Sequence, residues 1–211
     1  MPSHKSSPKK TRAIQVPQRA NGRLRVAAIL EAAAVVIAER GYEAATMAEI
    51  AARSGTKIGS LYRFFPNKES LADMIVVSAR ENLDTVFDKF DAGVKALSVQ
   101  ALADGLVVQL VEQIFGRPVL MKLVDASEDW SVKREEFKSA SLRRIGKSLL
   151  IHSPSLSKKS AEDIALVLLF TAKTMAKQDL SDSALAEFRD MTRLYLQSRL
   201  KAEKASPQCK R

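Results

Sequence analysis

The 211-residue sequence predicts an all-α protein, in which a three-helix N-terminal unit is joined through a long helix to a C-terminal helical core. After Asn21, apolar residues recur at steps of three and four, the spacing of an amphipathic helix. Glycine and proline interrupt these segments where helices would end. No stretch shows the sustained two-residue alternation of a half-buried strand. A content of 46% hydrophobic residues is enough to form a core.

The first two helices are bounded by recognisable end signals. Asn21 can cap the first helix, and Gly41 can end it by adopting the left-handed conformation. The tetrapeptide Thr46 to Glu49 has the form of a capping box, in which the threonine oxygen accepts from an amide and the glutamate reaches back. A short second helix should therefore begin at Thr46 and end near Gly55.

The third and fourth helices follow directly. A short helix is expected over about residues 57–63, and Pro66 closes it. Asn67 can cap a long fourth helix that runs to about Phe90. Further amphipathic segments are expected over residues 96–115, 118–126, 128–151, 158–178 and 182–203.

Positive charge is concentrated at the N-terminus. The chain carries a formal charge of +10 and a pI near 9.8, which favours an anionic partner. Residues 1–30 contain seven basic residues and no acidic one: Lys5, Lys9, Lys10, Arg12, Arg19, Arg23 and Arg25. Residues 1–21 lack apolar periodicity and are expected to form a flexible basic arm, either a solvated tail or a segment that contacts DNA.

Two short helices joined by a turn that contains Gly55 match a helix-turn-helix over residues 46–65. In that motif the second helix lies in the major groove, so Lys57, Ile58 and Ser60 are placed to reach base edges. Tyr62 can donate its hydroxyl to a phosphate, and Lys68 at the next helix start offers an ammonium. Gly59 is expected to let this helix pack closely against its neighbours, with Phe65 buried beneath it.

The stretch TMAEIAARSGTKIGSLYRFFPNKESL, residues 46–71, resembles the helix-turn-helix of the TetR family of bacterial transcriptional repressors. The resemblance covers about residues 22–82. One departure is the pair Thr56-Lys57, where the family has an apolar residue followed by a hydroxyl. The matching residues are Thr46, Ile50, Ala51, Gly55, Gly59, Ser60, Leu61, Tyr62, Phe65, Lys68, Glu69 and Leu71. With this resemblance we assign DNA contact to Thr46, Lys57, Ile58, Gly59, Ser60, Tyr62, Arg63 and Lys68.

The resemblance also implies a role for the remainder of the chain. Residues 83–203 would form a dimerisation and ligand-sensing core, followed by a tail over residues 204–211. The expected interface consists of Leu168, Ala172, Leu185, Phe188, Met191 and Tyr195, although burial within one subunit would account for part of these stripes. The expected pocket residues are Met74, Trp130 and Phe137, although a lone tryptophan such as Trp130 is more often a core residue.

The sequence thus predicts a ligand-released repressor that acts as a homodimer on a (pseudo)palindromic operator in double-stranded DNA, with an unknown small-molecule effector. The alternatives are an architectural DNA-binding protein of low sequence specificity, and a helical ligand carrier or enzyme that does not bind DNA. We find no catalytic motif, no metal-ligand cluster and no cofactor motif. A single cysteine, Cys209, and the lack of an apolar run near the ~20 residues that span a bilayer predict a cytoplasmic protein.

Overall fold

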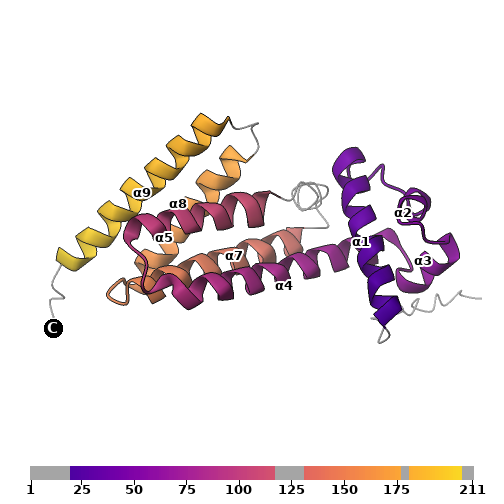
Figure 1. Cartoon of the computed structure of the whole chain (residues 1–211), viewed down its shortest axis with the longest axis horizontal. Coiled ribbons are helices and arrows are strands. Elements are labelled where there is room, and N and C mark those ends of the chain that lie inside the picture. Colours follow the sequence, from indigo (N-terminus) through magenta and orange to yellow (C-terminus); the bar gives the residue numbers. More distant parts are fainter. Residues whose placement is uncertain (1–19, 117–130, 177–180, 206–211) are drawn as a thin grey trace, which may run out of the picture. The chain divides into compact units, whose positions relative to one another are not determined.

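The computed structural model describes residues 20–116, 131–176 and 181–205, and every regular element within these ranges is helical (Figure 1). The predicted all-α fold is therefore confirmed. Contacts between residues divide the chain into two compact units, residues 1–75 and 76–211. Trp130 and most of the basic arm lie outside the described residues.

The first unit contains α1 (Ala20–Arg40), α2 (Met47–Arg53), α3 (Ile58–Phe64) and the first turns of α4 (Lys68–Val94). Asn21 lies inside α1 and does not cap it as predicted, because the helix begins at Ala20. Thr46 does cap α2, accepting a hydrogen bond from the amide of Glu49 at 3.2 Å. The carboxylate of Glu49 differs from the capping-box prediction: it accepts from Arg40 Nε of α1 at 2.7 Å.

A small apolar core holds this unit together. The inward face of α1 meets residues from α2, α3 and α4, and each of these side chains is almost fully buried: Ile29, Ala33, Val36, Ile37, Ile50, Leu61, Phe65 and Leu71. Two glycines with positive φ, Gly41 at 82° and Gly55 at 61°, end α1 and α2. Asn67 caps α4 as predicted, since its Oδ1 accepts from the Ser70 amide at 2.8 Å.

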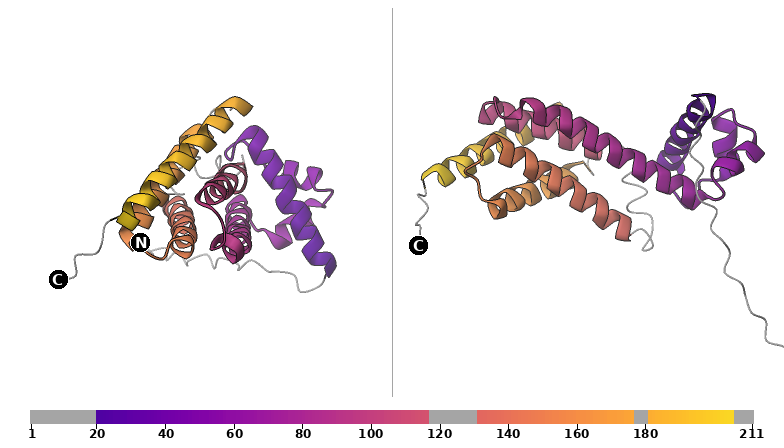
Figure 2. Two further views of the ribbon diagram at one scale, coloured as in Figure 1. Left: turned by 60° about the vertical axis from the view of Figure 1, so that its left-hand side comes forward. Right: turned by 90° about the horizontal axis from the view of Figure 1, so that it is seen from below.

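The second unit continues α4 and adds α5 (Val99–Val108), η1 (Gln109–Phe115), α7 (Ser131–His152), α8 (Lys158–Met175) and α9 (Asp182–Ala205). Within it α7 packs against α8, α5 against α9, and η1 against α8 (Figure 2). The segment η1 is π-helical and follows α5 directly, a change of helix type that the sequence did not predict. Gly105 of α5 is required by close packing, because a Cβ atom there would overlap the Phe90 ring of α4.

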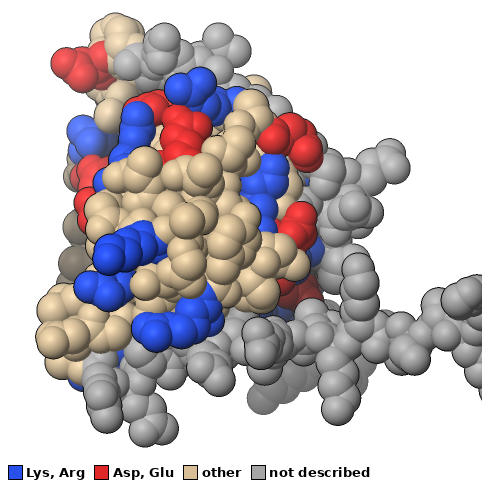
Figure 3. Space-filling model, turned by 90° about the vertical axis from the view of Figure 1, so that its right-hand side faces the viewer, with Lys and Arg blue, Asp and Glu red and all other residues tan. Residues whose placement is uncertain are grey.

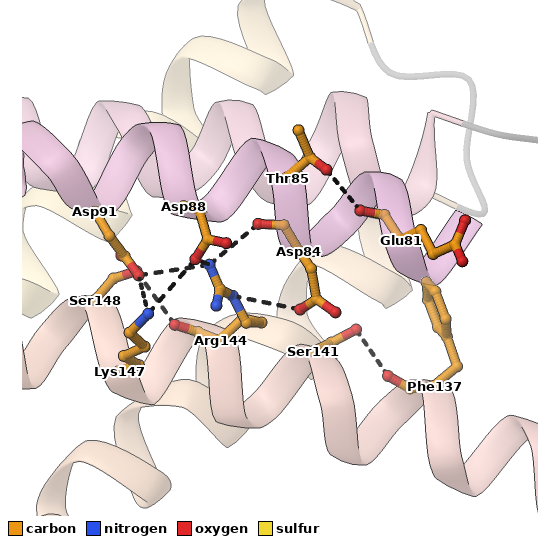
Figure 4. Close-up of polar contacts among 10 residues, drawn as sticks. All are labelled: Glu81, Asp84, Thr85, Asp88, Asp91, Phe137, Ser141, Arg144, Lys147 and Ser148. Atoms are coloured by element: carbon orange, nitrogen blue, oxygen red, sulfur yellow. Dashed lines mark hydrogen bonds and ion pairs between the residues drawn. The ribbon is translucent and has the colours of Figure 1, made fainter. Parts of the chain in front are cut away.

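An ionic cluster joins α4 to α7 (Figure 4). Asp84, Asp88 and Asp91 lie on one face of α4 because they are four and three residues apart. Arg144 Nη2 donates to Asp88 Oδ1 at 2.6 Å and to the Asp84 carbonyl at 3.2 Å. This hydrogen bond holds the pKa of the Asp88 carboxyl below its usual range. Lys147 Nζ lies 3.2 Å from Asp91 Oδ2.

Arg144 is the least exposed cation of this cluster. Its side chain is 13% exposed, and its guanidinium lies 5.6 Å from the centre of the Phe87 ring. Asp91 is only 7% exposed and also accepts a hydrogen bond from the Ser148 hydroxyl at 2.5 Å. A partly buried carboxylate depends on such partners, since a charge removed from water without them is costly.

We predict that Arg144→Met destabilises the second unit. The substitution keeps the apolar stem but removes the guanidinium, so that Asp91 retains only Lys147 and Ser148. Urea unfolding should show a loss of about 2–3 kcal/mol, below the ~3–5 kcal/mol of a fully buried pair, because Asp84 and Asp88 stay hydrated.

The neighbouring Arg143 provides the matched control. It is exposed and has no ion pair among the described residues, so Arg143→Met should change stability by no more than about 0.5 kcal/mol. Equal losses for the two variants would show that the cluster contributes nothing specific.

Candidate functional site

The turn between α2 and α3 is fixed by backbone contacts. Gly55 adopts the left-handed conformation, and the Thr56 amide donates to the Ala51 carbonyl at 3.0 Å. Thr56 is buried, and its hydroxyl lies 3.5 Å from the Ser54 carbonyl. Lys57 occupies the N-cap position of α3 without a side-chain cap. The Lys57 side chain is therefore left exposed at the start of α3.

Helix α3 buries one face and exposes the other. Leu61 and Phe64 point into the core of the first unit. Ile58 and Tyr62, one turn apart, are 44% and 49% exposed. These two apolar side chains lie together on the outward side of a helix that also exposes cationic groups, so the outward face of α3 is a candidate binding surface. It also carries Gly59 and Arg63, both exposed, whereas Ser60 is half-buried.

Gly59 has a different role from the one predicted. A Cβ atom built on it would meet nothing within 4 Å, so close packing within the protein does not require glycine there. The residue lies on the exposed side of α3. Its missing side chain instead leaves the backbone of α3 open to an approaching molecule.

Lys68 also has different partners from those predicted. Its ammonium donates to the carbonyls of Tyr42 and Glu43 at 2.8 and 3.0 Å, and it lies 4.5 Å from the centre of the Tyr42 ring. These contacts tie the start of α4 to the turn after α1. An ammonium has three N–H donors, so the contact between Lys68 and a phosphate stays a prediction. Burial of Tyr42 raises the pKa of its phenol to about 12.

The surface around α3 is positive at neutral pH. No acidic residue occurs from Lys57 to Phe65, which include Lys57 and Arg63. Two acidic residues of α1 and α2 are paired with arginines: Glu49 accepts from Arg40, and Arg53 donates to Glu39 at 2.7 Å, a hydrogen bond that lowers the pKa of Glu39. Figure 3 shows Lys and Arg side chains beside a wide uncharged surface in the lower left of the view, with Asp and Glu mainly toward its top and right.

In the second unit a cavity of about 250 Å³ lies between η1, α7 and α8. Five apolar residues line it: Ile114, Phe115, Phe137, Leu169 and Phe170. Arg134, Glu135, Lys138, Ser141 and Lys173 complete the lining. Of the predicted pocket residues, Phe137 lines this cavity, Met74 belongs to the other unit and does not, and Trp130 lies outside the described residues. A larger and more open groove of about 830 Å³ runs between α7 and α8.

The expected interface residues are mostly internal. Leu168, Ala172 and Phe188 are 1–2% exposed and belong to the core of the second unit, so they cannot contact another subunit without unfolding. Leu185 and Tyr195 are half-buried against the same core. Only Met191 of the expected set is a strongly exposed apolar residue. The exposed apolar stripe consists of Leu166, Val167, Phe170, Met191 and Leu194.

The first unit contains the part of the chain that matches a known protein family. A family model described as bacterial regulatory proteins, tetR family, matches residues 29–75. The HTH-type transcriptional repressor KstR2 of Rhodococcus jostii is 38% identical over 87 residues, which make up 41% of this chain and 41% of the repressor. The family match thus covers the helix-turn-helix and the helices beside it, and the chain spans less than half the length of this repressor.

Solved structures share the fold over a longer span. A transcriptional regulator from Aquifex aeolicus matches 82% of this chain and 98% of its own, at 22% identity and a TM-score of 0.63. The transcriptional regulator FadR from Bacillus subtilis, solved in complex with stearoyl-CoA, matches 81% and 96% at 20% identity and a TM-score of 0.60. Identities this low show a common fold and nothing about ligands.

The described residues hold no group of three or more metal-ligating side chains. Among them, no helix is long and apolar enough to cross a membrane. Sequence reasoning missed the anchoring of Lys68 and the cations around the cavity. The cations around the cavity could have been found from the sequence, because Arg134 and Lys138 are four residues apart and therefore lie on one face of α7.

Two glycine substitutions test the local geometry of this helix-turn-helix. Gly59→Ala should raise the free energy of unfolding by about 0.5–1 kcal/mol, because the position is helical and open. Gly55→Ala should lower it by about 1 kcal/mol or more, since φ is 61° there. Urea unfolding of both variants checks the pair. A destabilised Gly59→Ala protein would restore the close-packing interpretation.

Proposed function

We propose that this protein is a sequence-specific DNA-binding regulator of transcription that acts as a homodimer on a (pseudo)palindromic operator and is released by a small-molecule effector. The observation that carries the proposal is the outward face of α3, where exposed Ile58 and Tyr62 lie beside Arg63 and Lys57 with no acidic neighbour along the helix. The similarity to the repressor KstR2 over 87 residues supports repression as the direction of regulation.

The side chains of this face divide into two kinds of contact. Ile58 is suited to a thymine methyl, which is the apolar feature of the major groove, and Lys57 and Ser60 to base acceptors. Arg63 and Tyr62 are suited to phosphates, which fix position but carry no base information. The Thr46 hydroxyl accepts the capping hydrogen bond and can still donate to a phosphate. Gly59 lets the DNA approach the helix, and Lys68 acts by holding the turn at Tyr42.

The experiment that tests the proposal is selection of bound sequences from a random duplex pool. A recovered palindrome that binds much more tightly than random DNA supports a specific regulator. A binding ratio near one indicates an architectural DNA-binding protein, and no binding at moderate salt refutes DNA binding altogether.

Variants of α3 then separate the two kinds of contact. Ile58→Ala should weaken operator binding by about 1–3 kcal/mol and random DNA much less. Arg63→Ala should weaken both alike and reduce the slope of log affinity against log salt by about 1. Binding is measured by fluorescence anisotropy across a salt series.

Lys68→Met is the third variant, because the Lys68 ammonium already donates to two backbone carbonyls of the protein. It should leave the salt slope unchanged. If Lys68→Met reduces the slope of log affinity against log salt as much as Arg63→Ala does, Lys68 contacts a phosphate. An Ile58→Ala variant that loses affinity equally for all DNA would remove Ile58 from base recognition.

Dimerisation is proposed on the exposed apolar stripe of α8 and α9. Val167 and Phe170 on α8 and Met191 and Leu194 on α9 are 45–67% exposed. Large exposed apolar side chains on two neighbouring helices of the sequence suit an interaction site, and paired helices from two subunits would bury them as a four-helix contact. Two half-sites read together also give an operator more affinity than one.

We predict that Leu194→Glu yields monomers, because it places a charge in the centre of the proposed contact. Light scattering at micromolar concentration measures the mass. Leu24→Glu is the matched control, since Leu24 on α1 is exposed to the same degree, 70% against 67%, and lies in the other unit. Dimers retained by Leu194→Glu would show that the contact lies elsewhere.

The effector site is proposed in the cavity between η1, α7 and α8. It is an apolar concavity with a few polar groups, the usual composition of a small-molecule site. An effector there must bind the DNA-bound and released forms with different affinities, because otherwise it cannot change DNA binding.

A further inference from the structure

We propose that the cavity between η1, α7 and α8 takes a small carboxylate with an apolar tail. This inference rests on the proposed function for its biological meaning, since it names the chemical class of the effector. It is carried by the size of the cavity, its apolar interior and the Lys173 ammonium in its lining.

The interior of the cavity is apolar. Ile114 and Leu169 are 2% and 5% exposed and form part of the core of the unit. Phe115 and Phe137 pack against that core from the cavity side. The polar group among them, the Ser141 hydroxyl, already donates to the Phe137 carbonyl at 2.9 Å. A tail that enters here finds apolar contacts and needs no hydrogen-bonding groups of its own.

The charges around the cavity favour an anion. Three cations and one anion line it: Arg134, Lys138 and Lys173 against Glu135. Lys138 Nζ lies 2.7 Å from Glu135 Oε2, so these two charges neutralise each other. Lys173 in the last turn of α8 has no carboxylate partner among the described residues. A carboxylate at this position would gain an ion pair without displacing an existing one.

The size of the cavity limits the ligand. Its 250 Å³ is below the ~300–1,000 Å³ typical of pockets for drug-sized molecules. It equals about eight times the ~30 Å³ that a water molecule occupies in the liquid, and a methylene group is of similar volume. An acyl chain of about eight carbons, or an aryl acid of similar bulk, would therefore fill it.

Calorimetry with three probes of equal tail length tests the ligand class. Octanoate should bind at least tenfold more tightly than octan-1-ol, and octyltrimethylammonium should bind most weakly. From hexanoate to octanoate each added methylene should tighten binding about fourfold, and chains well beyond eight carbons should gain nothing further. Equal affinity for the three head groups would overturn the inference.

Variants separate the head from the tail. Lys173→Met should weaken octanoate about fivefold and leave octan-1-ol unchanged, as expected for the loss of one partly exposed ion pair. Lys89→Met, an exposed lysine on α4 outside the cavity, is the matched control and should change neither. Phe137→Leu should weaken all three probes by similar factors. If neither Lys173→Met nor Phe137→Leu changes octanoate binding, the probe binds elsewhere and the assignment is refuted.

Operator release distinguishes this inference from the proposed function. If octanoate fails to bind while the operator still binds, the ligand class is wrong and DNA regulation stands. If octanoate binds with the expected dependence on Lys173 but the operator is retained, the ligand class is supported and effector control at this site fails.

Discussion

Helix α4 takes part in both units, and the Arg144 guanidinium is the group that fixes its second half. Leu71 and Ala72 at the start of α4 are buried in the first unit, whereas Leu83 and Phe87 are buried in the second. Beside Leu83 and Phe87, aspartates spaced along one face of α4 meet cations of α7 (Figure 4). Charged contacts are directional in a way that apolar contacts are not, so they fix the register of α4 against α7 where apolar packing alone would permit sliding.

The outward face of α3, which we propose binds DNA, depends on a second constraint, the left-handed turn at Gly55. This turn directs Leu61 and Phe64 inward and thereby leaves Ile58 and Tyr62 exposed. Leu61 and Phe64 are the residues that α3 contributes to the core, so Ile58 and Tyr62 remain on the surface. Lys68 supports the arrangement from the other side by binding the carbonyls of the turn after α1.

The second unit divides the apolar residues of α8 between two uses. Leu168 and Ala172 complete the core, whereas Val167 and Phe170 face outward. Phe170 contributes to the exposed stripe and also lines the cavity. The proposed subunit contact and the proposed effector site therefore share a side chain, which gives a bound ligand a direct physical route to the dimer.

The sequence by itself determined the helical class, most helix ends and the helix-turn-helix. These features arise from local rules: Thr46 and Asn67 cap with their own side chains, and Gly41 and Gly55 adopt a conformation that other residues resist. Amphipathic spacing also placed the core correctly for Ile29, Ile37 and Ile50, because a helix with one apolar face buries that face.

Only the tertiary structure decided which apolar residues of α8 and α9 are internal. It also decided which polar side chains already have hydrogen-bond partners within the protein. The stripe with Leu168 and Phe188 looked as suitable for a partner subunit as for the core, since periodicity gives the face of a helix but not its neighbour. Lys68 looked free because the carbonyls that bind it lie 25 and 26 residues earlier in the chain. The π-helical turn of η1 and the cavity beside it likewise depend on how α5, α7 and α8 pack together, and such long-range packing leaves no local pattern in the sequence.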